Sequence, residues 1–196
     1  MFAGATGDPD QPKRLTWHVA GTGGKIVMAE IDRQRPGWRV ALGGWRHTAP
    51  LPSADGVSTV SGATGLFVVS EHLLAGRAAD DSGGDPNAFR LDGWVRYGRT
   101  FTASATIGSY LGGGLVAHNP WPGMPDDSFG LAIARALIPH GIDPALAAET
   151  VIEASWQHQF TPHLLVQPDL QWIHQPGGDN TRHNCVLIGL RLIVLH

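Results

Sequence analysis

Three segments near the end of the chain alternate polar with apolar side chains: residues 149–160, 163–174 and 184–196. Each is about ten to twelve residues long, and short turn-like breaks separate them. Strands that cross a bilayer at a tilt need ~9–11 residues each. The length and regularity of the alternation therefore predict long β-strands, either in a membrane or in a soluble sheet.

A period near two continues through most of the chain and predicts further strands. Proline and glycine dominate the breaks between them because these residues fix or permit the backbone angles of turns. Residues 129–137 also have helical propensity, but the alternation of Phe129, Leu131 and Ile133 with small residues favours a strand. The expected strands cover residues 25–32, 38–47, 64–72, 89–99, 107–118, 128–137, 149–160, 163–174 and 184–196.

Other segments carry less of this pattern. A short helix is an alternative over residues 144–150, where Asp143 is a suitable N-cap. Residues 1–24 are expected to be mostly connection, within a single β-barrel region that spans residues 1–196. The first 14 residues lack the apolar stretch and cleavage site of a signal peptide.

The composition narrows the class of protein. Charged residues make up 16% of the chain, below the ~25% of typical soluble proteins, and glycine occurs 26 times. The net charge of -3 does not favour nucleic-acid binding. No run of 18 apolar residues is present, so a membrane position would require a β-barrel. Cys185 is the one cysteine in the sequence and excludes an internal disulfide.

The two faces of the expected strands have different meanings in different environments. In a soluble β-sandwich the apolar face packs into a core, whereas in a porin it meets lipid and the polar face lines a wet lumen. Alternation alone does not separate these interpretations. The soluble alternative is a β-sandwich carbohydrate-binding module.

A family resemblance adds to this pattern. The segment V-Q-P-D-L-Q-W-I-H-Q-P-G-G (residues 166–178) resembles the penultimate strand and loop of OprB-type carbohydrate-selective porins. The flanking E-A-S-W-Q-H-Q-F-T-P-H-L (153–164) and V-L-I-G-L-R-L (186–192) resemble the neighbouring strands. Weaker colinear similarities extend upstream to G-D-P-D-Q-P-K-R at residues 7–14.

The resemblance implies an all-β fold, an antiparallel transmembrane β-barrel. About nine strands of a 16-stranded porin barrel are expected here, as in the C-terminal half of a truncated or fragmentary family member. It also implies an outer-membrane porin for passive diffusion of glucose-type carbohydrates, with sugars in transit and outer-membrane lipid as partners. A homo-oligomer is among the assemblies that it allows. No cofactor, metal or nucleic-acid partner is expected.

Sugar passage requires hydrogen-bonding groups that replace water around hydroxyls, with charged and aromatic side chains at the narrowing. Arg96 and Arg191 are the strongest single candidates because arginine in mid-strand is costly when it faces lipid. The sugar-contacting candidates on the inward face are Glu30, Glu71, Asp92, Trp94, Arg96, Glu153, Gln157, Gln167, Asp169, Gln171 and Arg191.

Enzymatic chemistry is not expected. Glu149 and Glu153 resemble a glycosidase pair, but four residues along one strand place them roughly 13 Å apart. His158, His163 and His174 lie on neighbouring expected strands without metal-ligand spacing. A small outer-membrane barrel enzyme, the third interpretation, therefore lacks a catalytic set.

Overall fold

The computed structural model describes residues 2–3, 24–52, 58–77, 88–102, 107–124, 126–139 and 146–194. Within them, ten strands form one antiparallel sheet in which every strand pairs with its neighbours in the sequence. The strands are β1 (Phe2–Ala3), β2 (Lys25–Arg35), β3 (Trp38–Pro52), β4 (Thr59–Ala75), β5 (Arg90–Thr100), β6 (Ser109–His118), β7 (Ser128–Leu137), β8 (Ala148–Thr161), β9 (Leu164–His174) and β10 (Cys185–Val194).

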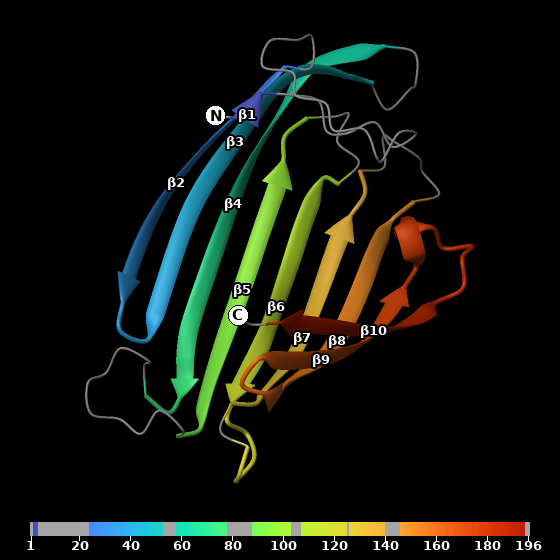
Figure 1. Ribbon diagram of the computed structural model, residues 1–196. Coiled ribbons are helices and arrows are strands. Elements are labelled where there is room, and N and C mark those ends of the chain that lie inside the picture. The colour runs from blue at the N-terminus through green and yellow to red at the C-terminus, as the bar shows by residue number, and fades with distance from the viewer. Residues whose placement is uncertain are drawn as a thin grey trace.

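The sheet curves strongly, and its last two strands turn back across the front of the view to form an open trough (Figure 1). Its order runs from β1 to β10, so the described sheet is not closed into a cylinder. A one-turn 3-10 helix, η1 (Pro176–Gly178), follows β9. No helix among the described residues is long and apolar enough to cross a membrane.

Two tight turns lie at the same end of the sheet, between β2 and β3 and between β8 and β9. In the first, Gly37 has a φ of 79°, which glycine adopts without the steric cost of a Cβ. This turn fixes the register that places Arg35 opposite Trp38 and Gln34 opposite Arg39. The hairpin register therefore decides which side chains share a face.

The sheet is a single layer with very few buried side chains. In the described residues the buried apolar set is small and contains no large, fully buried side chain. Many large apolar residues are exposed instead, among them Ile31, Leu66 and Ile188. Because no second layer of described residues covers this apolar face, the structure does not favour the soluble β-sandwich interpretation.

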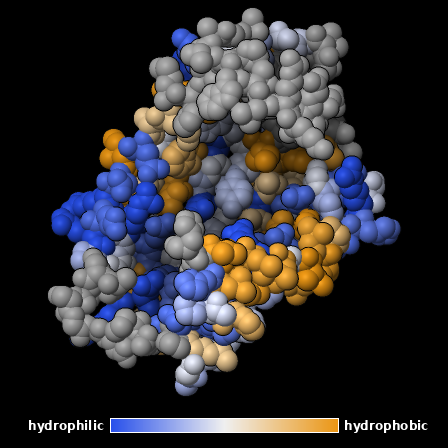
Figure 2. Space-filling view, in the orientation of Figure 1, coloured by the Kyte–Doolittle hydropathy of each residue, from blue (hydrophilic) through white to orange (hydrophobic). Residues whose placement is uncertain are grey.

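The two faces of the sheet differ in polarity. Figure 2 shows hydrophilic side chains gathered in the hollow of the trough and hydrophobic ones over the strands that turn toward the viewer. We call the face that lines the hollow the inner face and the opposite one the outer face. Side chains alternate between them along each strand, and paired residues of neighbouring strands share a face.

The structure confirms the predicted fold class and all nine long strands, with small shifts of their ends. β3 and β4 extend further than predicted, to Pro52 and from Thr59, because their hairpin continues past an irregularity between His47 and Pro50. Within the segment expected to be mostly connection, the described pair Phe2–Ala3 is β1, paired with β2. The single-region division of residues 1–196 stays a prediction.

The alternative helix over residues 144–150 is wrong for its described part. Leu146 forms an isolated bridge with Asp179, and β8 begins at Ala148. The carbonyl of Ala147 accepts a hydrogen bond from the amide of Ile138 at 2.8 Å, and its own amide donates to Gly178 at 2.9 Å. These bonds to neighbouring segments replace the intrahelical ones.

Candidate functional site

All eleven residues predicted to face inward share the inner face in the observed register. Asp92, Trp94 and Arg96 alternate along β5, and Glu71 pairs directly with Trp94. The remaining candidates follow from the same pairings or from alternation along a strand: Glu30, Glu153, Gln157, Gln167, Asp169, Gln171 and Arg191. Their contact with a solute stays a prediction.

One continuous row of paired residues crosses the inner face from β2 to β10. Polar or aromatic groups occupy its flanks except at Leu187 on β10, whereas the two positions near its middle, Gly114 and Ala132, are small. A small centre between polar flanks leaves room for a solute against the wall. The row runs Gln34, Arg39, Glu71, Trp94, Gly114, Ala132, Glu153, Gln171 and Leu187.

Arg39 is the centre of an ionic network at the β2–β4 side of this row. Its guanidinium contacts Glu30 Oε1 at 2.9 Å, Asp32 Oδ2 at 3.3 Å and Glu71 Oε2 at 3.6 Å. Glu71 also lies 4.0 Å from Arg96 Nη2 through its other oxygen. Because three carboxylates converge on Arg39, the orientation of this side chain is fixed from several directions.

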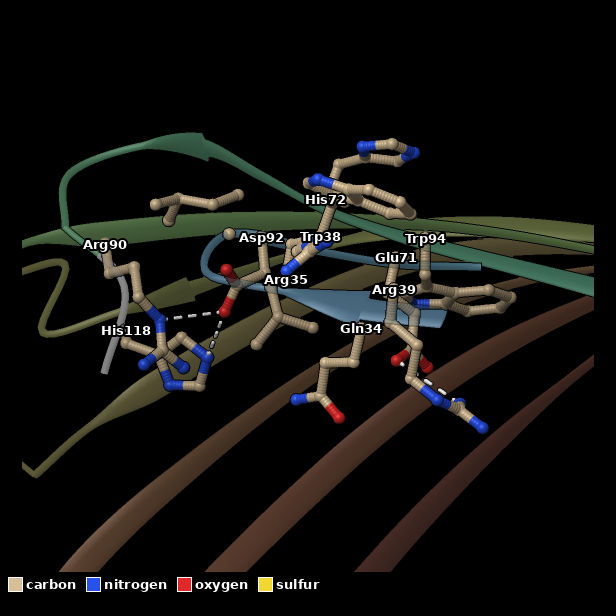
Figure 3. Close-up of a pocket in the computed structure, with 14 residues that line it drawn as sticks. Gln34, Arg35, Trp38, Arg39, Glu71, His72, Arg90, Asp92, Trp94 and His118 are labelled. Atoms are coloured by element: carbon tan, nitrogen blue, oxygen red, sulfur yellow. Dashed lines mark hydrogen bonds and ion pairs between the residues drawn. The ribbon is translucent and has the colours of Figure 1, made fainter. Parts of the chain in front are cut away.

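A second polar group lies at the start of β5. Asp92 Oδ2 accepts a hydrogen bond from Arg90 Nε at 2.8 Å and lies 3.2 Å from His118 Nε2. Figure 3 shows Arg90 and His118 both directed at this carboxylate. The three side chains come from β5 and β6 and are each partly exposed, so the carboxylate is held while its surroundings stay open to solvent.

Trp94 forms an aromatic platform on the inner face. A Cβ built on Gly114 would lie 2.9 Å from Trp94 Nε1, so the indole lies directly over this glycine. The guanidinium carbon of Arg96 lies 4.8 Å from the Trp94 ring centre, in cation–π geometry. The indole offers an apolar surface for a sugar ring, and the guanidinium over it offers N–H donors for the sugar hydroxyls.

A different arrangement occupies the β8–β10 side of the row. Gln171 Nε2 donates to Glu153 Oε2 at 3.2 Å and to Asp169 Oδ1 at 3.3 Å. No described cation lies within ion-pair distance of either carboxylate. Asp169 lies over Gly189, where a Cβ would overlap its carboxylate.

The remaining inner-face candidates of β8–β10 are less constrained. Arg191 pairs in register with Gln167 and is exposed, without an ion-pair partner among the described residues. Gln157 pairs with Ser128 and is aligned in register with Gln167, in the same row as Arg191. Cys185, a free thiol, shares the inner face through its pairing with Ile173.

Sequence reasoning missed several inner-face residues that the structure brings to the site. Arg39 is the most important, because it connects three predicted or neighbouring acidic side chains. The two-residue break at residues 36–37 is the signal that could have found it, since a tight turn there pairs Arg39 with Gln34. The other missed inner-face residues include Asp32, Arg90, Tyr110 and His118.

A recess of about 540 Å³ adjoins these groups. Its inner-face lining includes Arg39, Asp92 and Trp94, whereas Trp38 and His72 reach it from the outer face at the ends of their strands (Figure 3). The inner lining offers guanidinium donors, carboxylate acceptors and an indole in one place. Such a wall can exchange hydrogen bonds with a polyhydroxylated solute. No cluster of three metal-ligating side chains occurs in the part of the chain that the structure describes.

Comparison with known proteins identifies the family. The profile of the carbohydrate-selective porins, OprB family, matches residues 3–194. The chain belongs to this family. OprB porins are transport channels rather than enzymes, and they reside in the outer membrane. A comparison with curated proteins finds no match.

A solved structure supports the same fold. The structure titled "High pH structure of Pseudomonas putida OprB" superimposes with a TM-score of 0.75 at 20% sequence identity. The match covers 90% of this chain and 50% of that one, so this chain spans about half the length of the Pseudomonas putida protein. At this identity the likeness concerns the fold, an antiparallel porin sheet.

Proposed function

We propose that this chain forms part of the wall of an outer-membrane porin through which glucose-type carbohydrates diffuse passively. The observation that carries the proposal is the segregation of the two faces. The exposed apolar side chains lie mainly on the outer face, and all seven carboxylates within the long strands lie on the inner face. This is the arrangement expected of a sheet between lipid and a wet lumen.

The inner wall supplies the chemistry that sugars need. Trp94 is the stacking platform, Arg96 and Glu71 are donor and acceptor beside it, and Glu153 and Gln171 continue the same row across the wall. Each group exchanges hydrogen bonds with water and with hydroxyls at similar cost, so a sugar passes without a deep binding well. The wall binds weakly at several positions, which suits passage rather than retention.

Liposome swelling tests this proposal. The chain is reconstituted into liposomes, and swelling in isosmotic glucose is compared for wild type, Trp94→Ala and Arg96→Gln. We expect glucose-dependent swelling by the wild type and slower swelling by both variants, because each removes part of the platform. Val95→Ala is the matched control, since Val95 lies between the two residues and points to the outer face.

Two outcomes would contradict the proposal. Swelling no faster than in protein-free liposomes would refute glucose passage by this chain. Equal rates for wild type, Trp94→Ala and Arg96→Gln would refute the assignment of the platform while leaving the family membership untouched. Circular dichroism of each variant in detergent verifies that the β-structure is retained.

A further inference from the structure

Charge on the outer face has one sign. Every Asp and Glu of the described long strands is on the inner face, whereas the charged side chains of the outer-face strand positions are all cations. These outer cations are Lys25, Arg33, Arg35, Arg46, Arg99 and Arg135. A surface that only had to contact hydrocarbon would carry no charge, so their positions require an explanation.

Three of these arginines lie along one end of the sheet. Arg99 is one residue from the end of β5, and Arg135 is two residues from the end of β7. Arg99 pairs with Leu66 on β4, and Leu66 pairs with a residue of β3. Arg46 lies two residues beyond that residue along β3. Neighbours in this line are separated by two strands and two residues, or about 12 Å between Cα atoms.

The line follows the stagger of the sheet. Relative to the hydrogen-bonded register, the arginine is shifted by two residues from β3 to β5 and by two more, in the same direction, from β5 to β7. On β5, for example, Tyr97 and not Arg99 is the residue aligned with Arg135. The C-terminal ends of β3, β5 and β7 are shifted in the same direction along the sheet. The three guanidiniums, which we call the arginine line, therefore lie at a similar depth along one edge of the apolar surface.

The arginine line is exposed and uncompensated. Arg46, Arg99 and Arg135 are all exposed, and no described carboxylate forms an ion pair with any of them. Exposed apolar side chains such as Leu66 and Leu111 lie next to them on the same face. A guanidinium is costly at the bilayer midplane but inexpensive at the interface, where its stem covers apolar surface and its head meets polar groups.

We propose that the arginine line binds phosphate-bearing lipid headgroups, with the acyl chains of the same lipids lying on the apolar surface beside it. Guanidinium matches phosphate in bidentate geometry and keeps its charge at all relevant pH values. Basic residues near a membrane surface attract anionic lipid. The proposal rests on the outer face contacting the membrane, as proposed above, and it does not depend on sugar passage.

The opposite end of the outer face is built differently. There Asp127, 3% exposed, accepts a hydrogen bond from Trp156 Nε1 at 2.9 Å and pairs with His158 Nδ1 at 2.7 Å. Trp121 and Trp156 are in edge-to-face contact in the same cluster. Rings of this kind are typical of a membrane interface. The outer-face strand cations at this end, Arg33 and Arg35, both lie on β2, so they form no line across several strands of the described sheet.

Quenching of tryptophan fluorescence by brominated lipids tests the proposal. The chain is placed in dodecyl maltoside micelles doped with dibrominated phosphatidic acid or dibrominated phosphatidylcholine. Trp172 is a suitable reporter, because it lies on the outer face of β9, close in register to Arg135 through Thr150 and His174. We expect half-maximal quenching at a phosphatidic acid concentration lower by on the order of tenfold, and a smaller preference at high salt.

Substitutions localise the effect. The triple variant Arg46→Gln, Arg99→Gln, Arg135→Gln should lose most of this preference and still be quenched by phosphatidylcholine. The matched control removes three exposed cations from the other end of the sheet: Arg33→Gln and Arg35→Gln at the end of β2, and Arg77→Gln two residues after β4. It should keep the preference. If the triple variant does not fold, the single variants Arg99→Gln and Arg135→Gln should each show a partial loss.

Three results would overturn the proposal: no phosphatidic acid preference in the wild type, a triple variant that keeps it, or a control that loses it equally. Displacement of the quenching lipid by an equal concentration of inorganic phosphate would also overturn it, since that result indicates a site for free anions. Absence of quenching by either lipid would refute lipid contact of the outer face itself. Sugar flux is measured independently.

Discussion

The inner wall of β2–β6 and that of β8–β10 hold their carboxylates with different partners. On the first, arginines neutralise carboxylates in direct ion pairs centred on Arg39 and Asp92. On the second, the neutral amide of Gln171 bridges Glu153 and Asp169, and their charge is not balanced by a described cation. One side of the wall is therefore held by paired charges, whereas the other presents carboxylates without a described ion-pair partner to solvent.

Alanine substitution of one glycine in each wall is expected to give the largest difference in the free energy of unfolding. Gly114→Ala places a Cβ 2.8 Å from the backbone oxygen of Leu131, as well as against Trp94. Backbone cannot rotate away, so we expect a loss of about 1–3 kcal/mol in the free energy of unfolding. Gly189→Ala meets the Asp169 side chain, which can turn aside, and should cost less than about 1 kcal/mol. Urea denaturation in detergent, followed by tryptophan fluorescence, measures both. Equal losses would mean that the two walls are equally rigid.

The arginines of the two walls should also differ in their effect on stability. Arg39→Ala leaves Glu30, Asp32 and Glu71 close together without their shared cation, so the urea midpoint should fall. Arg191→Ala removes a side chain without a described ion-pair partner and should leave the midpoint unchanged. Each midpoint is compared with that of wild type under the same conditions. A fall for Arg191→Ala as large as for Arg39→Ala would contradict the distinction.

Ion selectivity should depend on the unpaired wall. Glu153→Gln combined with Asp169→Asn should reduce cation-over-anion permeability roughly twofold, or about 0.4 kcal/mol, because these charges are not neutralised locally. Glu30→Gln combined with Asp32→Asn removes two carboxylates that are in direct contact with the Arg39 guanidinium, which screens them locally, and should change selectivity less. Reversal potentials across a salt gradient in planar bilayers give the ratio. A larger change in the permeability ratio for Glu30→Gln with Asp32→Asn would contradict this assignment of selectivity to the β8–β10 wall.

The smallest expected effect concerns the connection between β9 and β10. The pKa of Asp179 is lowered, first because the Thr181 hydroxyl donates to its carboxylate at 2.6 Å, and then because the Thr181 amide donates at 2.9 Å. A lowered pKa means that this stabilisation is complete above the ~3.9 of an unfolded aspartate and is lost as pH falls through the lowered value. The tight turn at residues 36–37 has no titratable side chain and should be insensitive to acid.

Carbon-13 NMR of the Asp179 carboxyl group in micelles follows this titration. The midpoint should lie below that of an ordinary aspartate in wild type and move upward in Thr181→Ala. Arg182→Gln should move it less, since Arg182 is a weaker contributor and lies 3.2 Å away. An unchanged midpoint in Thr181→Ala would assign the effect to another partner.

Most of the sheet could be predicted because alternation has a period of two and needs no knowledge of distant contacts. Phe129, Leu131 and Ile133 alone indicate which face of β7 is apolar, even though their neighbours favour a helix by propensity. The same parity placed all eleven candidate residues on one face. What alternation cannot supply is the register between strands, so the convergence of three carboxylates on Arg39 was not predictable from β3 alone.

Prediction from local propensity was wrong where hydrogen bonds to distant segments determine the backbone conformation. Residues 144–150 were expected as a possible helix, but Ala147 bonds to both Ile138 and Gly178, segments that are far apart in the sequence. Trp94 was predicted to face inward, but its packing over Gly114 was not, because that contact depends on the neighbouring strand. In both cases the decisive information is which residue faces which across the sheet.

The position of Cys185 allows water access to the hollow to be measured on the unaltered chain. It is the one cysteine in the sequence, and pairing through Ile173 and Val151 places it in the same row as Arg96. A membrane-impermeant thiol reagent thus has a single target, and its rate of attachment reports how freely water reaches the hollow. Bulky and small reagents used in turn would gauge the width of the passage without any engineered substitution.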